Sequence, residues 1–323
     1  MQITVSVIIP NYNHALYLKK RIDSVLCQSY IDFEVIILDD CSTDNSKDVI
    51  EAYRTHPKVS HIIYNETNSG STFKQWNKGL SLARGQFIWV AESDDVADSD
   101  FLKKMIEPLF NTENIGLVFC QSYQFNENDE STGTWKFHTH DIISYNWETD
   151  FQDNGKSFIV NAMMFKNPIV NASAVVFRKS LVNKSDFIDT NMTLNGDWLF
   201  YIKCLLKADV FFVSEPLNYF RAHNNKGSSS NIKNFNNVKE YYYILAFLFS
   251  HIKVSHTEKS IVKENVFNIW YYQADGKFNT IFNKQFIPIL KNAYKVDKTI
   301  LLRFTVQWFR KRSQNLKNLF KTI

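Results

Sequence analysis

Three carboxylates within four positions are the strongest chemical signal in this sequence. Glu92, Asp94 and Asp95 follow the apolar run 87–91, which is typical of a buried strand. Carboxylates at this spacing repel one another and lose solvation on burial, so they need a compensating partner. Mg²⁺ and Mn²⁺ bind carboxylate oxygens, commonly one or two of them together with phosphate oxygens. Two interpretations follow: a metal–phosphate site, or an acidic turn that only caps the next helix.

A second acid pair, Asp39 and Asp40, ends the apolar run that begins at Phe33. A carboxylate just beyond such a strand can accept hydrogen bonds from a base or a ribose. The alternative is an N-cap for the following helix, a role that Ser42 or Thr43 could equally take. The first strand is followed by "PNYNHA" and not by a GxGxxG motif, and GxxxxGK[ST] is absent. The sequence therefore argues against NAD-type and P-loop phosphate binding.

Three residues later in the chain have chemistry that suits a phosphate or a proton transfer. Asp197 follows Gly196 at a predicted helix start, where the helix dipole stabilises a carboxylate. Arg221 can bind a phosphate through two parallel hydrogen bonds, and a neutral His223 can ligate a transition metal. Each has a plainer interpretation, as a helix cap, a structural cation or a solvent-exposed imidazole. Alone, none of the three would establish a site.

Strand and helix patterns alternate over the first 120 residues and place the acids. Strands are predicted near 3–10, 33–40, 58–65, 86–92 and 115–123, and helices near 15–30, 42–56, 70–85 and 98–110. This alternation predicts an α/β fold with a doubly wound, mostly parallel sheet. Ligands of such sheets bind beyond the carboxyl ends of the strands, and both acid clusters fall there.

The rest of the chain divides into a poorly periodic part and a helical part. Residues 121–168 show no clear period and are predicted to form loops and short elements. A strand and turn at 171–182, a helix at 195–208 and a strand or strand pair at 209–223 follow. Helices are then predicted at 236–252, 257–276, 280–294 and 297–320. We expect a boundary near residue 230.

Composition limits the classes of protein that fit. The chain has 323 residues, of which 45% are apolar and 22% charged, as in an ordinary globular protein. Its four cysteines are scattered without a CxxC pair, which argues against a zinc site. The N-terminus resembles a first strand and not a signal peptide, and no apolar window of about 18 residues occurs. These features predict a cytoplasmic protein with reduced thiols.

The C-terminal end is strongly basic. Nine Lys or Arg residues and one acid, Asp297, lie between Lys291 and Ile323. Apolar and aromatic residues alternate with these cations over 297–323, so a helix there would be amphipathic. Such a helix suits an anionic membrane surface, or packs on the body of the protein with its basic face in solvent. Nucleic acid would also suit the basic tail, but the acid clusters give it no support.

Seven motifs, taken in their order, resemble the family 2 inverting glycosyltransferases of GT-A fold. They are "VSVIIPNYN", "SVLCQSY", "FEVIILDDCSTDNS", "NSGSTFKQWNKGL", "ARGQFIWVAESDD", "GDW" and "YFRAHNNKGSSS". The resemblance covers about residues 3–230 and is of the bacterial cell-envelope glycan type. It implies a Rossmann-like nucleotide-binding half at 1–120, an acceptor-binding half at 121–230 and a helical extension at 231–323. It also implies a nucleotide-diphospho-sugar donor, Mn²⁺ or Mg²⁺, and inversion in a single step.

The resemblance carries roles to individual residues. Three residues match positions that bind the nucleoside: Pro10, Tyr12 and Asp40, with Asp40 on the base. Asp94 matches a position that contacts the ribose. Asp95 and His223 match positions at the metal and diphosphate, and Asp197 matches the catalytic base. Further donor or phosphate contacts are expected from Glu92, Asn68 and Arg221. Glu92 departs from the family pattern, which has Asp there, and its side chain is one methylene longer.

The function that follows is the transfer of a sugar from a nucleotide-sugar donor to a hydroxyl of a glycan or lipid-linked acceptor. A UDP-sugar is the preferred donor over a dTDP-sugar. The expected place is the cytoplasm, with peripheral contact at the inner face of the membrane through 297–323. One alternative is a non-catalytic module that binds sugar nucleotides or glycans. Another is a nucleotidyltransferase, which also uses paired acids and a metal. That class would need a basic phosphate-binding loop near the N-terminus, and "PNYNHA" lacks one.

Overall fold

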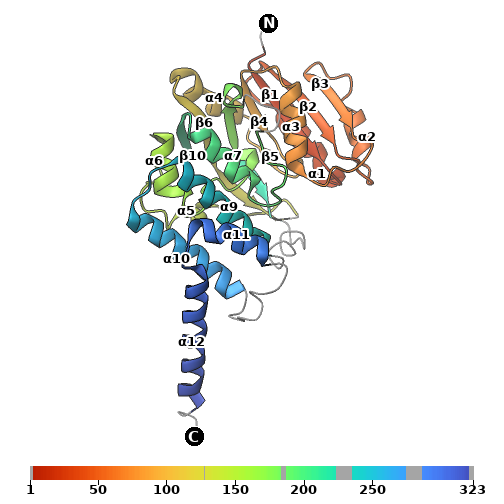
Figure 1. Cartoon of the computed structure of the whole chain (residues 1–323). Coiled ribbons are helices and arrows are strands. Elements are labelled where there is room, and N and C mark those ends of the chain that lie inside the picture. Colours follow the sequence, from red (N-terminus) through yellow and green to blue (C-terminus); the bar gives the residue numbers. More distant parts are fainter. Residues whose placement is uncertain (1–2, 127, 183–186, 223–234, 274–285, 320–323) are drawn as a thin grey trace. The chain divides into compact units, whose positions relative to one another are not determined.

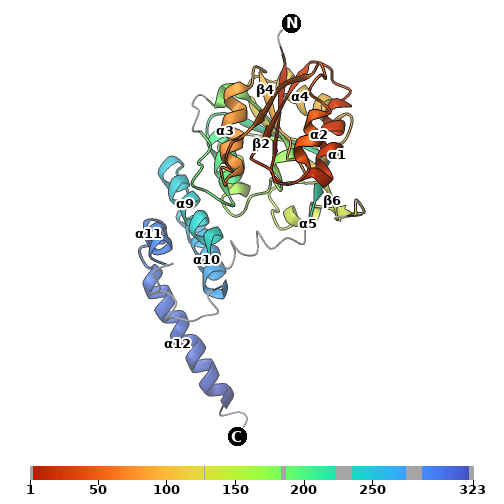
Figure 2. The ribbon, with the colours of Figure 1, turned by 90° about the vertical axis from the view of Figure 1, so that its right-hand side faces the viewer.

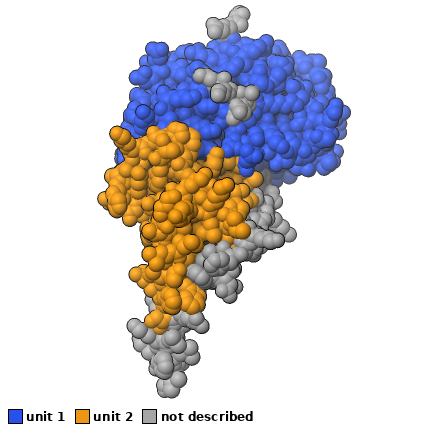
Figure 3. All heavy atoms as spheres, in the orientation of Figure 1, with its two compact units in different colours: residues 1–191, 196–224 blue, residues 192–195, 225–323 orange. Residues whose placement is uncertain are grey.

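The computed structural model describes residues 3–126, 128–182, 187–222, 235–273 and 286–319, so His223 lies outside it. The chain forms two compact units (Figure 3). The first unit comprises residues 1–191 and 196–224, and the second, here called the helical unit, comprises 192–195 and 225–323. The short segment 192–195 therefore groups with residues that lie 30 or more positions further along the chain.

The first unit is built on one large sheet, confirming the predicted α/β class (Figure 1). Its described strands run in the order β3-β2-β1-β4-β9-β6-β10-β5, with β7 beside β6 and β8 beside β10. Their bounds are β1 Val5–Asn11, β2 Phe33–Asp39, β3 Val59–Tyr64, β4 Phe87–Val90, β5 Val96–Ala97, β6 Ile115–Phe125, β7 Ser131–Thr134, β8 Phe151–Asp153, β9 Val175–Arg178 and β10 Asp209–Arg221. The first four sheet neighbours, β3, β2, β1 and β4, are parallel.

Helices cover both faces of these parallel strands (Figure 2). They are α1 Ala15–Leu26, α2 Ser46–Glu51, α3 Thr72–Leu82 and α4 Phe101–Asn111. β1 and β2 are buried along their whole length, as expected for strands covered on both sides. Gly79 lets α3 approach β1 closely, because a Cβ there would lie 2.4 Å from a side-chain carbon of Ile8. All four helices fall within or near the predicted ranges.

Beyond β4 the sheet becomes mixed, which the sequence pattern did not indicate. β9 runs antiparallel between β4 and β6 and directly follows the 3₁₀ turn η2 (Ala172–Ala174). β6 and β10 are parallel to each other. β5 pairs antiparallel with the end of β10, through Val96 opposite Tyr219. This pairing brings the end of β10 beside the acidic turn that follows β4.

Residues 121–168 contain short elements, as predicted. They include β7, β8, α5 (Lys136–Thr139), α6 (Gly155–Phe158) and the π-helical turn η1 (Ile159–Met163). This segment has no regular hydrophobic period, and contacts between aromatic rings hold it in place instead. Trp147 packs at 5.2 Å from Phe212 and 5.4 Å from Phe151, measured between ring centroids. Such clusters of rings bury large apolar areas without requiring long helices.

The helical unit contains α9 (Asn236–His251), α10 (His256–Gln273), α11 (Ile287–Val296) and α12 (Ile300–Leu319). Its core includes Ile244, Trp270 and Phe304, of which Trp270 and Phe304 meet with ring centroids 4.7 Å apart. Over the described residues, none of the helices combines the length and the hydropathy that a membrane span requires.

Candidate active site

The acidic turn after β4 alternates between buried and partly exposed side chains. Ser93 and Asp95 are each 2% exposed, whereas Glu92 and Asp94 are partly exposed. Residues 93 and 94 form a turn, in which the Asp95 amide donates to the Glu92 carbonyl oxygen at 3.3 Å, and this turn leaves Glu92 and Asp94 on the more open side. The turn therefore presents two carboxylates outward and holds a third inside the protein.

A pocket of about 440 Å³ lies at the carboxyl ends of β1 and β2 and beside this turn. It brings together five residues that the sequence singled out: Pro10, Tyr12, Asp40, Asn68 and Glu92. Also lining it are Asn11, His14, Gly70, Ser71, Thr72, Gln75 and Ser93. Asp94, Asp95, Asp197 and Arg221 are not among the lining residues. A larger pocket, of about 530 Å³, lies at the opposite end of the sheet, where β6 and β10 begin.

The two acids after β2 have different partners. Asp39 accepts hydrogen bonds from Asn11 Nδ2 at 2.8 Å and from the Ser42 amide and hydroxyl at 2.9 and 2.6 Å, which closes the turn after β2. Asp40 accepts from Asn65, Ser69 and Gln75 at 2.6–2.9 Å.

Asp40 thus holds the loop between β3 and α3. Because the same carboxylate lines the pocket, Asp40 sets the shape of the pocket wall in addition to any contact with a base.

Arg21 is a residue of the site that the sequence analysis missed. Its side chain is fully buried on α1, and its Nε donates to the backbone oxygen of Glu92 at 2.8 Å. One Nη lies 3.7 Å from a carboxylate oxygen of Asp95. The spacing of the buried residues Leu18, Arg21, Ile22 and Val25 puts this arginine on the apolar face of a helix. A cation in that position needs a buried anion, and this signal could have predicted the partner.

Burial and mutual repulsion raise the pKa values of two of the acids. Burial and the neighbouring charge of Asp94 raise the pKa of Glu92 to about 8, although Trp76 Nε1 donates to its carboxylate at 2.8 Å. Burial and Asp94 also raise the pKa of Asp95 to about 7, against the opposing effect of Arg21. A proton or a cation bound at this turn would relieve the repulsion.

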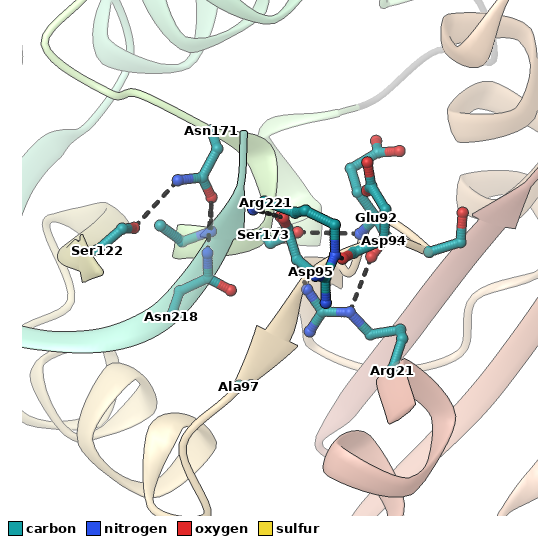
Figure 4. Close-up of polar contacts among 12 residues, drawn as sticks. Arg21, Glu92, Asp94, Asp95, Ala97, Ser122, Asn171, Ser173, Asn218 and Arg221 are labelled. Atoms are coloured by element: carbon teal, nitrogen blue, oxygen red, sulfur yellow. Dashed lines mark hydrogen bonds and ion pairs between the residues drawn. The ribbon is translucent and has the colours of Figure 1, made fainter. Parts of the chain in front are cut away.

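Arg221, expected to contact a phosphate, is committed to protein groups. It is 2% exposed, and its Nε and Nη1 donate to the backbone oxygens of Asp94 and Asn126, both at 2.9 Å. Its Nη2 pairs with Asp129. Its amide donates to Asp95 at 3.0 Å (Figure 4). Arg221 therefore fixes the acidic turn to the end of β10, and a phosphate contact stays a prediction.

A buried polar network fixes the start of the acidic turn (Figure 4). The amide of Glu92 donates to Ser173 Oγ at 3.0 Å, and Trp89 Nε1 donates to the Ser173 carbonyl at 2.8 Å. Asn171 caps the turn that carries Ser173, accepting from the Ala174 amide at 3.0 Å. On the pocket side, His14 Nδ1 and Ser93 Oγ are 2.8 Å apart. The sequence analysis did not identify His14 or Ser173.

Asp197 lies in the first turn of α7 (Gly196–Leu205), as predicted. Its Oδ1 accepts from the Trp198 amide at 2.7 Å, which is the capping contact considered from the sequence. Tyr201 lies one helical turn further and is buried. Burial raises the pKa of its hydroxyl, and the negative charges of Asp197 and Glu92 raise this pKa further. The base candidate and the acidic turn therefore share a neighbour.

Aromatic packing connects α7 with the pocket wall. The Phe73 and Trp76 rings of α3 meet edge to face at 5.5 Å, and Trp76 meets Phe200 of α7 at 6.2 Å. Gly196 abuts Phe73 so closely that a Cβ there would be 2.5 Å from the ring. Because Trp76 also donates to Glu92, these rings fix α7 relative to the acidic turn.

The donor atoms of the turn suit a hard cation. Over the described part of the chain, no cluster of three His, Cys, Asp or Glu side chains could hold a metal by itself. Mg²⁺, however, is usually held by one or two carboxylates together with substrate phosphates. The partly exposed carboxylates of Glu92 and Asp94 fit an ion that binds together with a diphosphate, whereas Asp95 is buried and its contact with a metal stays a prediction.

Comparison with known proteins identifies one family. The model of "Glycosyl transferase family 2" matches residues 6–184, more than half of the chain. A putative teichuronic acid biosynthesis glycosyltransferase, TuaG, from Bacillus subtilis is 41% identical over 103 residues, which is 32% of this chain. The match spans 40% of that relative's length, and the matches to two further curated relatives also span less than half of theirs.

Solved structures share the fold. Residues 1–349 of Staphylococcus aureus TarS, crystallised with UDP-GlcNAc, superpose with a TM-score of 0.65 at 21% identity, covering 92% of this chain and 82% of that one. The mannosyltransferase PcManGT from Pyrobaculum calidifontis, in complex with GDP-Man and Mn²⁺, superposes with a TM-score of 0.54 at 14% identity, covering 94% and 86%. These likenesses confirm the predicted fold, the mostly parallel α/β architecture of TarS with a helical C-terminal region.

Proposed function

The chain belongs to glycosyl transferase family 2, and from that premise we propose that it transfers a sugar from a nucleotide-diphospho-sugar, by preference a UDP-sugar, to an acceptor hydroxyl with inversion. The observation that carries the proposal is the pocket at the ends of β1 and β2, which unites Tyr12, Asp40 and Glu92. The half-exposed ring of Tyr12 suits stacking on a base, and the carboxylate of Asp40 suits its N–H groups. The UDP-GlcNAc complex of the TarS relative supports this class of donor.

The acidic turn is proposed to receive the donor's ribose and diphosphate. Asp94 would contact the ribose, and Asp95 would hold Mn²⁺ or Mg²⁺, with Glu92 as a further contact. A bound divalent cation neutralises charge on the leaving diphosphate. The raised pKa values of Glu92 and Asp95 support this assignment, since crowded carboxylates gain from a neighbouring positive charge. His223 and Asn68 remain proposed donor contacts, and Mn²⁺ in the PcManGT complex supports the choice of ion.

Asp197 is proposed as the general base that takes the proton from the acceptor hydroxyl. An inverting transfer needs one carboxylate on the side of the sugar opposite the leaving group. Asp197 is partly exposed, and its position is fixed relative to Glu92 through Phe200 and Trp76.

Replacement of Asp197 by Asn tests the reaction. We expect donor affinity, measured by calorimetry, to stay within about twofold, while the rate of transfer falls by about 10²–10⁴-fold, the usual contribution of a positioned base. Asp189→Asn, at an acid of the preceding loop, is the matched control. Near-normal turnover of Asp197→Asn would rule out the assignment, and a wild type that binds donor without turnover would favour a non-catalytic binding module.

The acceptor is proposed to be a glycan or lipid-linked saccharide, with residues 121–230 forming the part that binds it. We place the reaction in the cytoplasm, at the inner face of the membrane, with α12 as a peripheral contact. Exposed apolar residues of α12 support this contact: Leu301, Leu302, Val306 and Phe309. The basic residues of 297–323 suit anionic headgroups.

A further inference from the structure

Glu240 on α9 is a buried carboxylate that the donor pocket does not use. It is 6% exposed and accepts four hydrogen bonds from one short segment, three of them from backbone amides and one from a hydroxyl. Its Oε1 accepts from the amide and hydroxyl of Thr193 at 2.6 and 2.9 Å, and its Oε2 from the amides of Leu194 and Asn195 at 3.1 and 2.7 Å. Three consecutive N–H groups around a carboxylate form an anion-binding nest, and such bonds are stronger than neutral ones.

The anchored segment leads directly into the proposed catalytic residue. Residues 192–195 group with the helical unit, and Gly196 opens α7, with Asp197 as its second residue. Only Gly196 separates the last anchored amide, that of Asn195, from Asp197. Gly196 is itself confined by Phe73, whose ring leaves no room for a Cβ. The backbone that carries Asp197 is therefore held immediately before it and at its neighbour.

We propose that Glu240 is a positioning residue for the transfer reaction, acting by fixing the backbone from which Asp197 projects. The proposal rests on the function above, in which Asp197 is the base. A displacement of about 1 Å at a reacting group can reduce a rate by about 10²-fold, so an anchor at this point controls turnover without touching the substrate.

Kinetics of Glu240 variants test the proposal. Glu240→Gln keeps the shape of the side chain but turns an NH₂ group toward backbone donors. We expect its kcat to fall by about 10–10²-fold while the donor KM stays within about twofold. Glu240→Asp retains the carboxylate and should recover part of the loss. Val238→Ala is the matched control, because it removes a fully buried side chain from the same helix and leaves the carboxylate in place.

A double variant shows whether Glu240 acts through Asp197. In the Asp197→Asn background, adding Glu240→Gln should leave the residual rate unchanged, because the base that it positions is already absent. An equal fold-loss in both backgrounds would overturn the proposal. So would a loss of kcat in Val238→Ala as large as that in Glu240→Gln.

Hydrogen exchange provides a readout that does not depend on activity. The amides of residues 193–195 should lose protection in Glu240→Gln and retain it in Val238→Ala. If the wild type transfers no sugar while this loss of protection is seen, the proposed function fails and the anchor stands as a structural contact only. If the wild type is active but Glu240→Gln keeps both kcat and protection, the inference about Glu240 fails while the proposed function survives.

Discussion

At the scale of single residues, the site depends on how three crowded carboxylates are accommodated. Two sets of partners do this: Arg21 beneath the turn, and Arg221 with Ser173 at its ends. That Glu92 and Asp94 share a side could be predicted, although a turn at residues 93 and 94, and not an extended backbone, produces the arrangement. The partners could not, since they come from α1, η2 and β10 and meet only in the folded chain.

The raised pKa of Glu92 predicts how stability depends on pH. Between about pH 4.5 and about pH 8 the folded protein holds a proton on Glu92 that the unfolded chain has released. The folded state then binds more protons, so the free energy of unfolding falls as pH rises through this range. Glu92→Gln keeps an acceptor for Trp76 but cannot titrate, and it should flatten the decline. Urea unfolding of both proteins without metal would measure this, and parallel curves would contradict it.

At the scale of elements, the predicted helices and strands agree best with the structure where the hydrophobic pattern of the sequence is regular. Periodic segments such as α1 to α4 and the buried strands β1 and β2 were predicted close to their bounds. The antiparallel direction of β9 was not predicted, because its apolar sequence is compatible with a buried strand that runs in either direction. In α12, Ile300 and Phe304 are buried, whereas Leu302 and Phe309 are 62% and 60% exposed. Contact of this helix with a membrane stays a prediction.

Vesicle flotation tests the exposed face of α12. The full chain should float with vesicles containing anionic phosphatidylglycerol and stay behind with purely neutral ones, because apolar burial and charge both contribute. A double variant, Leu302→Ser with Phe309→Ser, should reduce flotation by about tenfold. Ile143→Ser, which changes an isoleucine that is 91% exposed elsewhere, is the control. Equal flotation of the double variant and the control would assign α12 to another role.

At the scale of the whole molecule, the chain combines a unit built on one large sheet with a helical unit. A boundary near residue 230 was predicted from the loss of strand signals, and the units change at residue 224. The grouping of 192–195 with the helical unit was not predicted, because no periodic signal connects Thr193 with Glu240. Hydrogen bonds to backbone amides leave no trace in hydropathy, which is why this connection became visible only in the structure.

The central claim is that the pocket at the ends of β1 and β2 binds a sugar nucleotide, and calorimetry tests it most directly. The full chain would be titrated with UDP- and dTDP-sugars, with and without Mn²⁺. We predict that at least one donor binds the wild type more tightly with Mn²⁺. Tyr12→Ala should weaken that binding by about 5–150-fold, as expected from the loss of one stacked base. Failure of every donor to bind, or equal affinity of wild type and Tyr12→Ala, would contradict the claim.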